Sequence, residues 1–184
     1  MTETDEAIYR RFLKYRNEDD MRLLFDRHRE SLILFLIGYV HNLDDAEELM
    51  MDTFAIVASG MAAFSDRSSF KTWLFAIARN QAGTFLRKQR RSFAVMPEIR
   101  SESENAPELF LLQQEENRQL YLVLETLPED YRHVLYLLYF ERMSYEEVCT
   151  VMRKTKKQVY NLAERGRKAL REKLERMGPD DAQF

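Results

Sequence analysis

The chain has 184 residues, 45% of them apolar, and a formal net charge of -3. That length is enough for one core of moderate size or two small ones. The single cysteine, Cys149, excludes an internal disulfide and a tetrahedral metal site built from cysteines, and the scarcity of glycine and proline among many good helix formers predicts an all-α protein.

The N-terminus and the most apolar stretch of the chain predict a cytoplasmic protein. The first residues are acidic and lack the positive start and apolar run of a secretory signal. The most apolar stretch, 32–40, is about half of the roughly 20 residues that cross a membrane. We therefore expect no membrane insertion and interpret this stretch as part of a buried helix.

The first two predicted helices cover residues 5–15 and 20–40. Both keep the 3.6-residue period of an amphipathic helix. The apolar stripes consist of Ile8, Phe12 and Tyr15 in the first helix, and of Met21, Leu24, Phe25, His28, Leu32, Phe35, Leu36 and Tyr39 in the second.

A third helix is predicted to start at a capping box formed by Asp44 and Glu47. Its buried face is expected to contain Ala46, Leu49, Met50, Thr53, Phe54, Val57 and Met61. Its acidic residues form a block of Asp44, Asp45, Glu47, Glu48 and Asp52. Such a block is either a partner surface or a solvated helix face.

Residues 64–69 break the period with turn-forming residues, and Ser68 or Ser69 can cap a fourth helix over 70–91. This segment carries a basic block with no acid between its ends: Arg67, Lys71, Arg79, Arg87, Lys88, Arg90 and Arg91. The net charge of the whole chain hides this segregation, which favours nucleic acid as one partner.

The helical pattern disappears over 92–106, where proline, serine, asparagine and glutamate give the composition of a flexible tether. We therefore predict an N-terminal domain over 1–92, a linker over 93–106, a C-terminal domain over 107–178 and a tail over 179–184. Pro107 and Pro128 are each well placed to start a helix of the second domain.

Two further capping boxes follow in the second domain, one formed by Ser144 and Glu147 and the other by Thr155 and Gln158. They indicate a short helix, a tight turn and a longer basic helix, which is the layout of a helix-turn-helix. The residues left on the outer side of the second helix are Lys156, Lys157, Tyr160, Asn161, Glu164, Arg165 and Lys168. The alternative is a helical hairpin with a basic outer face, because the turn offers Arg153 and Lys154 where a glycine is common.

Three motifs in this order resemble those of extracytoplasmic-function sigma factors of bacterial RNA polymerase. The segments are DDAEEL (44–49) with DTF (52–54), SSFKTWLFAIARN (68–80) with RKQRR (87–91), and LPEDYR (127–132) with YFERMSYEEV (139–148). The resemblance covers nearly all of the chain from about Leu24 to Leu174. It implies an alternative sigma factor that binds promoter DNA, helps to melt it and is not itself an enzyme.

The resemblance also implies a partner for each motif. The coiled coil of the largest polymerase subunit would be bound by Asp45, Glu48, Leu49, Met51, Asp52 and Phe54. The minus-ten element would be bound by Ser65, Asp66, Arg67, Lys71, Arg79, Asn80, Arg87, Arg90 and Arg91. The minus-thirty-five element would be bound by Thr155, Lys156, Lys157, Tyr160, Asn161, Glu164, Arg165 and Lys168. The family also implies an anti-sigma factor as a partner.

Several alternatives remain open at this level. Leu49 and Phe54 fit a core as well as a partner surface, and Trp73 fits the core better than a base-stacking role. The three histidines and Cys149 are interpreted as structural residues, so no catalytic residue, metal or cofactor is expected. A helix-turn-helix regulator of duplex DNA is the main functional alternative, and a helical protein that only titrates polymerase or an anti-sigma factor is another.

Overall fold

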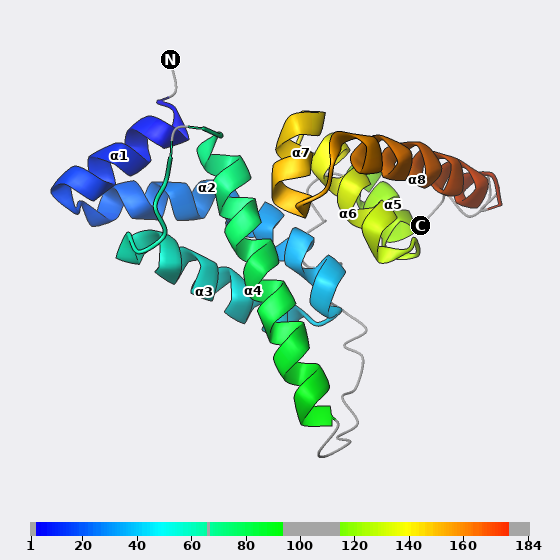
Figure 1. The fold of residues 1–184 in the computed structure, drawn as a ribbon, viewed down its shortest axis with the longest axis horizontal. Coiled ribbons are helices and arrows are strands. Elements are labelled where there is room, and N and C mark those ends of the chain that lie inside the picture. The colour runs from blue at the N-terminus through cyan, green and yellow to red at the C-terminus, as the bar shows by residue number, and fades with distance from the viewer. Residues whose placement is uncertain (1–2, 66, 94–114, 177–184) are drawn as a thin grey trace. The chain divides into compact units, whose positions relative to one another are not determined.

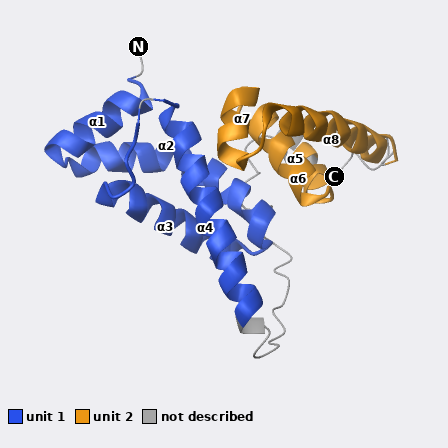
Figure 2. Ribbon diagram, viewed as in Figure 1, with its two compact units in different colours: residues 1–103 blue, residues 104–184 orange. Residues whose placement is uncertain are grey.

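The computed structural model describes residues 3–65, 67–93 and 115–176. Within these ranges every regular element is a helix, which confirms the predicted all-α class. The chain divides into two compact helical units, 1–103 and 104–184 (Figure 2).

The first unit is built around its second helix. Its helices are α1 (Asp5–Tyr15), α2 (Glu18–Val40), α3 (Leu43–Ser59) and α4 (Phe70–Phe93). Helix α2 packs against each of the other three (Figure 1). Leu24, Leu32 and Leu36 on α2 are fully buried, and Phe35 contacts Phe75 of α4 with ring centroids 5.1 Å apart. Burying this apolar stripe supplies most of the driving force for the unit.

Three details of the first unit differ from the predictions. The cap of α3 is Asn42, whose side chain accepts from the N–H of Asp45 at 2.9 Å, so the predicted capping box at Asp44 is wrong. Met61 follows α3 instead of lying on its buried face, and it is 83% exposed. Tyr15 is 65% exposed because α1 buries Tyr9 instead.

The second unit contains the helices α5 (Glu115–Glu125), α6 (Glu129–Leu135), η1 (Tyr136–Phe140), α7 (Tyr145–Met152) and α8 (Lys156–Arg176). The predicted helix after Pro128 runs through α6 and continues as η1, a π-helical turn in which the N–H of Glu141 donates to the carbonyl of Tyr136 at 3.2 Å. The Tyr136 hydroxyl also donates to Glu141, and the Tyr136 ring stacks on Phe140. The predicted start at Pro107 lies outside the described residues.

Three arginines and one histidine, each next to the end of a helix or helical turn, lie in the left-handed backbone region. Arg16, His41, Arg142 and Arg153 have φ between 51° and 54°, whereas Gly60 has φ of 72° after α3. A side chain raises the energy of this conformation, and a cation near a helix C-terminus offsets part of that through the helix dipole.

Candidate nucleic-acid interface

The second unit contains the predicted helix-turn-helix in α7 and α8. Ser144 and Glu147 form a complete capping box at the start of α7. Thr155 and Gln158 form the second box, with the N–H of Thr155 donating to Gln158 Oε1 at 2.8 Å and the N–H of Gln158 donating to Thr155 Oγ1 at 3.3 Å. Arg153 adopts the left-handed conformation between the helices, so the turn forms without the glycine. Both capping predictions are confirmed.

The inner face of α8 packs on α6. Val159, Ala163 and Gly166 are buried, and a Cβ built on Gly166 would lie 3.2 Å from Leu135 Cδ1. Gly166 therefore permits a close approach of the two helices. This contact fixes which residues of α8 face solvent.

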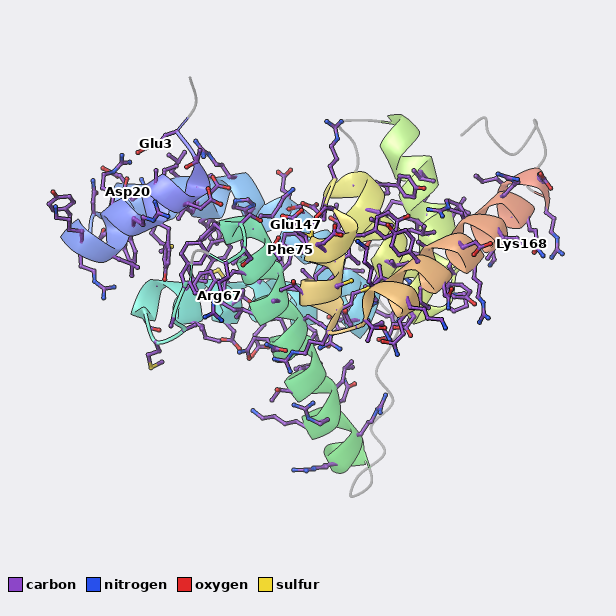
Figure 3. The ribbon with its side chains drawn as sticks, turned by 45° about the horizontal axis from the view of Figure 1, so that its top comes forward. Glu3, Asp20, Arg67, Phe75, Glu147 and Lys168 are labelled. Atoms are coloured by element: carbon purple, nitrogen blue, oxygen red, sulfur yellow. The ribbon has the colours of Figure 1, made fainter. Side chains whose placement is uncertain are left out.

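The outer face of α8, here called the recognition surface, is exposed as predicted. Lys168 marks it in Figure 3. Its members are Thr155, Lys156, Lys157, Tyr160, Asn161, Glu164, Arg165 and Lys168. Asn161, Glu164, Arg165 and Lys168 line a shallow surface depression together with Arg167 and Arg171. Donors and acceptors of this kind match those that base edges and phosphates present in the major groove of DNA.

Three contacts between α7 and α8 were not predicted. The rings of Tyr145 and Tyr160 stack in nearly parallel planes with centroids 4.2 Å apart, and the hydroxyl of Tyr145 accepts from Arg167 at 3.1 Å. Lys156 Nζ donates to Glu146 Oε1 at 2.5 Å. This hydrogen bond lowers the pKa of the Glu146 carboxyl and raises the pKa of the Lys156 amine. Two residues of the recognition surface are therefore held in place by the first helix of the motif.

Helix α4 of the first unit carries the first basic block. Arg87, Arg90 and Arg91 are exposed, whereas Lys71, Arg79 and Asn80 are half-buried. Ser69 is the cap of this helix, since its Oγ accepts from the N–H of Thr72 at 3.2 Å. The loop before α4 exposes Ser65 and Arg67, and Arg67 is labelled in Figure 3. Asp66 lies outside the described residues.

An aromatic cluster lies beneath this loop. Trp73 is half-buried and its ring lies 5.3 Å from Tyr9, 5.2 Å from Phe64 and 5.7 Å from Phe70. Phe70 is fully buried. Trp73 therefore has the packing role that its apolar stripe predicted.

Helix α3 exposes only part of the predicted polymerase-binding set. Glu48, Met51 and Asp52 are exposed, and Met51 is 55% accessible. Asp45, Leu49 and Phe54 are buried, with Phe54 packing against Phe25 at 5.0 Å. These three residues support the helix from its buried side. Leu49 and Phe54 therefore lie in the core, which was the alternative to a partner surface.

Two of the three histidines are buried, and the third ends a helix. His28 is buried and its Nε2 lies 2.7 Å from Asp5 Oδ2, a contact that lowers the pKa of the Asp5 carboxyl. His41 ends α2 in the left-handed conformation, and His133 is buried. The part of the chain that the structure describes contains no cluster of side chains suited to a metal ion. None of its helices is long and apolar enough to span a membrane.

Comparison with known proteins identifies related sequences. A family model described as Sigma-70 region 2 matches residues 24–92, and one described as Sigma-70, region 4 matches residues 117–170. The ECF RNA polymerase sigma factor SigX of Bacillus subtilis is 28% identical over 165 residues, which are 86% of this chain and 85% of the relative. The ECF RNA polymerase sigma-E factor of Escherichia coli is 27% identical over 160 residues, or 81% of this chain and 83% of the relative.

Two solved structures share the fold. CnrH in complex with the cytosolic domain of CnrY has a TM-score of 0.67 at 20% identity and covers 96% of this chain and 100% of its own. RpoE of Bartonella quintana with the anti-sigma factor NepR has a TM-score of 0.66 at 23% identity and covers 85% and 97%. Since the two family matches occur in this order and together cover more than half of the sequence, the chain belongs to the sigma-70 family, as an extracytoplasmic-function (ECF) sigma factor.

Proposed function

We propose that this sigma factor directs core RNA polymerase to a set of promoters and assists their melting, acting in the cytoplasm by binding and not by catalysis. The observation that carries the proposal is the pairing of the helix-turn-helix of the second unit with a first unit that has its own basic helix, α4, and an acidic face on α3. A regulator that only binds duplex DNA would use the helix-turn-helix and leave α4 and the acidic face of α3 without a role.

The recognition surface of α8 is assigned to the minus-thirty-five element. In a helix-turn-helix the second helix enters the major groove with its N-terminal half against base edges. Asn161 and Arg165 suit bidentate contacts with bases, Glu164 can accept from cytosine, and Lys157 and Lys168 suit phosphates. Exposure of all of these side chains on one face supports this assignment.

Helix α4 and the loop before it are assigned to the minus-ten element. Melting requires bases to leave the stack, so the unpaired strand needs a cationic track and hydrogen-bonding groups near its bases. Lys71, Arg79 and the exposed Arg87, Arg90 and Arg91 provide the cations along α4. Asn80, Ser65 and Arg67 provide polar groups for bases, and Asp66 stays in this set from the sequence alone.

The exposed acidic face of α3 is assigned to the polymerase. Glu48 and Asp52 flank Met51, an apolar side chain that is largely exposed on a helix whose other face is buried. An apolar contact ringed by charges is typical of a protein interface. Asp45, Leu49 and Phe54 would then act by holding this face in place.

An anti-sigma factor is proposed as a further partner, because one of the two solved structures reported above is a complex with the anti-sigma factor NepR and the other is a complex with the cytosolic domain of CnrY. Sequestration of the sigma factor would compete with capture by the polymerase.

The test is transcription in vitro from fragmented genomic DNA by bacterial core polymerase with and without this protein, with the start of each transcript mapped. New starts that share a two-part upstream motif are the expected result. A variant with Arg165→Ala serves as the matched control and should lose those starts. Duplex binding by the protein without any new start would instead support a helix-turn-helix regulator.

A further inference from the structure

One stripe of α1 contacts the last turn of α3, Gly60 and Phe64 in the loop between α3 and α4, and the first residue of α4. The stripe consists of Glu6, Tyr9, Leu13 and the C-cap Arg16, whose spacing of three, four and three residues places them on one face of a helix. Helix α1 precedes residues 24–92, the stretch matched by the region 2 family model. Its role is therefore open.

Glu6 holds the end of the loop. Its Oε1 accepts from the backbone N–H of Phe70, the first residue of α4, at 2.7 Å across 64 positions of sequence. The first N–H groups of a helix have no partner inside the helix, and the positive end of the helix dipole favours a carboxylate there. Ser69 caps a different N–H of the same turn, that of Thr72, so Glu6 adds to the local cap.

Tyr9 holds the middle of the loop. It is fully buried, and its ring lies 5.8 Å from Phe64 in an edge-on arrangement and 5.3 Å from Trp73. Its hydroxyl donates to the carbonyl of Val57 near the end of α3 at 3.0 Å. Phe64 is thereby fixed next to Ser65, the exposed residue assigned to the minus-ten element.

Leu13 and Arg16 hold the start of the loop. Arg16 donates to the carbonyl of Ala58 at 3.0 Å. A Cβ built on Gly60 would lie 3.4 Å from the Arg16 guanidinium and 3.6 Å from Leu13 Cδ2. The last turn of α3 and the left-handed glycine after it thus rest on the C-terminal end of α1.

We propose that α1 is a positioning element for promoter melting, in which Glu6 and Tyr9 preorganise the loop and the first turn of α4 to receive the unpaired minus-ten strand. Loops are ordinarily mobile, and ordering one during binding opposes the binding. A loop already held at its start, middle and end avoids most of that loss. This inference rests on the assignment of α4 to the minus-ten element.

The experiment uses holoenzyme assembled from core polymerase and the full chain. The probe is a single-stranded oligonucleotide with the non-template minus-ten sequence of a promoter found by transcript mapping, together with versions that change one base at a time. Glu6→Gln keeps the size of the side chain and removes its charge, and Glu6→Ala removes the acceptor. Glu3→Gln is the matched control, since Glu3 is half exposed and pairs with Arg11 instead.

The Glu6 variants should bind the matched strand roughly three- to tenfold more weakly, which is the size expected for losing one charged contact at a helix N-terminus. They should also discriminate less between the matched strand and the changed ones, while Glu3→Gln and binding of the minus-thirty-five duplex stay unchanged. Folding is checked by circular dichroism at the assay temperature. Where Glu6→Ala does not fold, the comparison between Glu6→Gln and the wild type tests the inference.

A purely structural role for Glu6 would lower the unfolding temperature and leave strand affinity and base discrimination as in the wild type, which would overturn the inference. A wild-type holoenzyme that does not distinguish the strands would overturn the minus-ten assignment itself, and the positioning role with it. The result for the Glu6 variants therefore tests the positioning role of α1, and the result for the wild-type holoenzyme tests the minus-ten assignment.

Discussion

Replacing Glu146 with glutamine should strengthen the binding of duplex DNA by α8. In the free protein, Lys156 Nζ is held by Glu146 Oε1 at 2.5 Å, so a cation of the recognition surface is already paired with an acid. Both side chains are largely exposed, and a DNA phosphate would compete with the carboxylate for the same amine. Glu146→Gln removes this competitor with little change in shape.

The magnitude follows from counterion release. One additional phosphate neutralised by the protein steepens the plot of log affinity against log salt concentration by about 0.9. Between 50 and 200 mM salt, the affinity gained by the variant over the wild type should shrink by about threefold. Fluorescence anisotropy of a labelled minus-thirty-five duplex over a potassium chloride series measures both slopes.

Glu129→Gln is the control, because it makes the same change in charge at an exposed position of α6 in the same unit. It should alter the slope less than Glu146→Gln. Equal affinities and equal slopes for the wild type and Glu146→Gln would refute the idea that Lys156 is a phosphate contact restrained by Glu146.

Four other changes have defined outcomes. Arg165→Ala should weaken binding of the minus-thirty-five duplex by about 1–3 kcal/mol, measured by the same titration. Glu48→Lys should impair capture of core polymerase in a pull-down and leave duplex binding intact. Gly60→Ala forces an L side chain into a φ of 72° and should destabilise the first unit by about 1 kcal/mol, or lower its unfolding midpoint by about 4–8 °C in calorimetry. The hydrogen bond with His28 lowers the pKa of the Asp5 carboxyl below its ordinary value of 3.8. The ionised Asp5 carboxylate therefore stabilises the folded state fully above that value, and this stabilisation is lost as the pH falls through the folded-state pKa. Asp5→Asn should remove this part of the acid dependence in denaturant titrations.

Each of these expectations has a contrary result. Normal promoter affinity of Arg165→Ala would remove Arg165 from the recognition surface, and normal capture of polymerase by Glu48→Lys would move the polymerase contact off α3. An unchanged unfolding midpoint of Gly60→Ala would mean that the turn after α3 relaxes without loss. Identical acid unfolding of Asp5→Asn and wild type would assign the pH dependence to other carboxylates.

The sequence predicts what depends on neighbouring residues. The 3.6-residue period gave the bounds of α1 and the outer face of α8, and the capping boxes at Ser144 and Thr155 formed as the local rule requires. The same rule predicted Asp44 as the N-cap of α3. Asn42, three residues before Asp45, is an equally good acceptor and is the cap in the structure. Two candidates so close together cannot be separated without the backbone.

The remaining features depend on contacts between distant residues. The hydrogen bond from Phe70 to Glu6 joins positions 64 apart, and nothing local marks either residue as a partner of the other. The Tyr145 and Tyr160 stack likewise depends on the angle at which α7 meets α8. By contrast, the burial of Leu49 and Phe54 followed from the helical period, so their assignment to a partner surface already conflicted with the pattern.

The left-handed arginines on either side of α7 make the presentation of α8 adjustable. Arg142 and Arg153 set the direction in which the chain enters and leaves α7, and both hold a backbone conformation that glycine or asparagine would adopt at lower energy. A single substitution at either turn can therefore change the stability or angle of the motif without altering a residue of the recognition surface. Promoter preference could then drift during evolution through the backbone of the turn alone, with every side chain of the recognition surface unchanged.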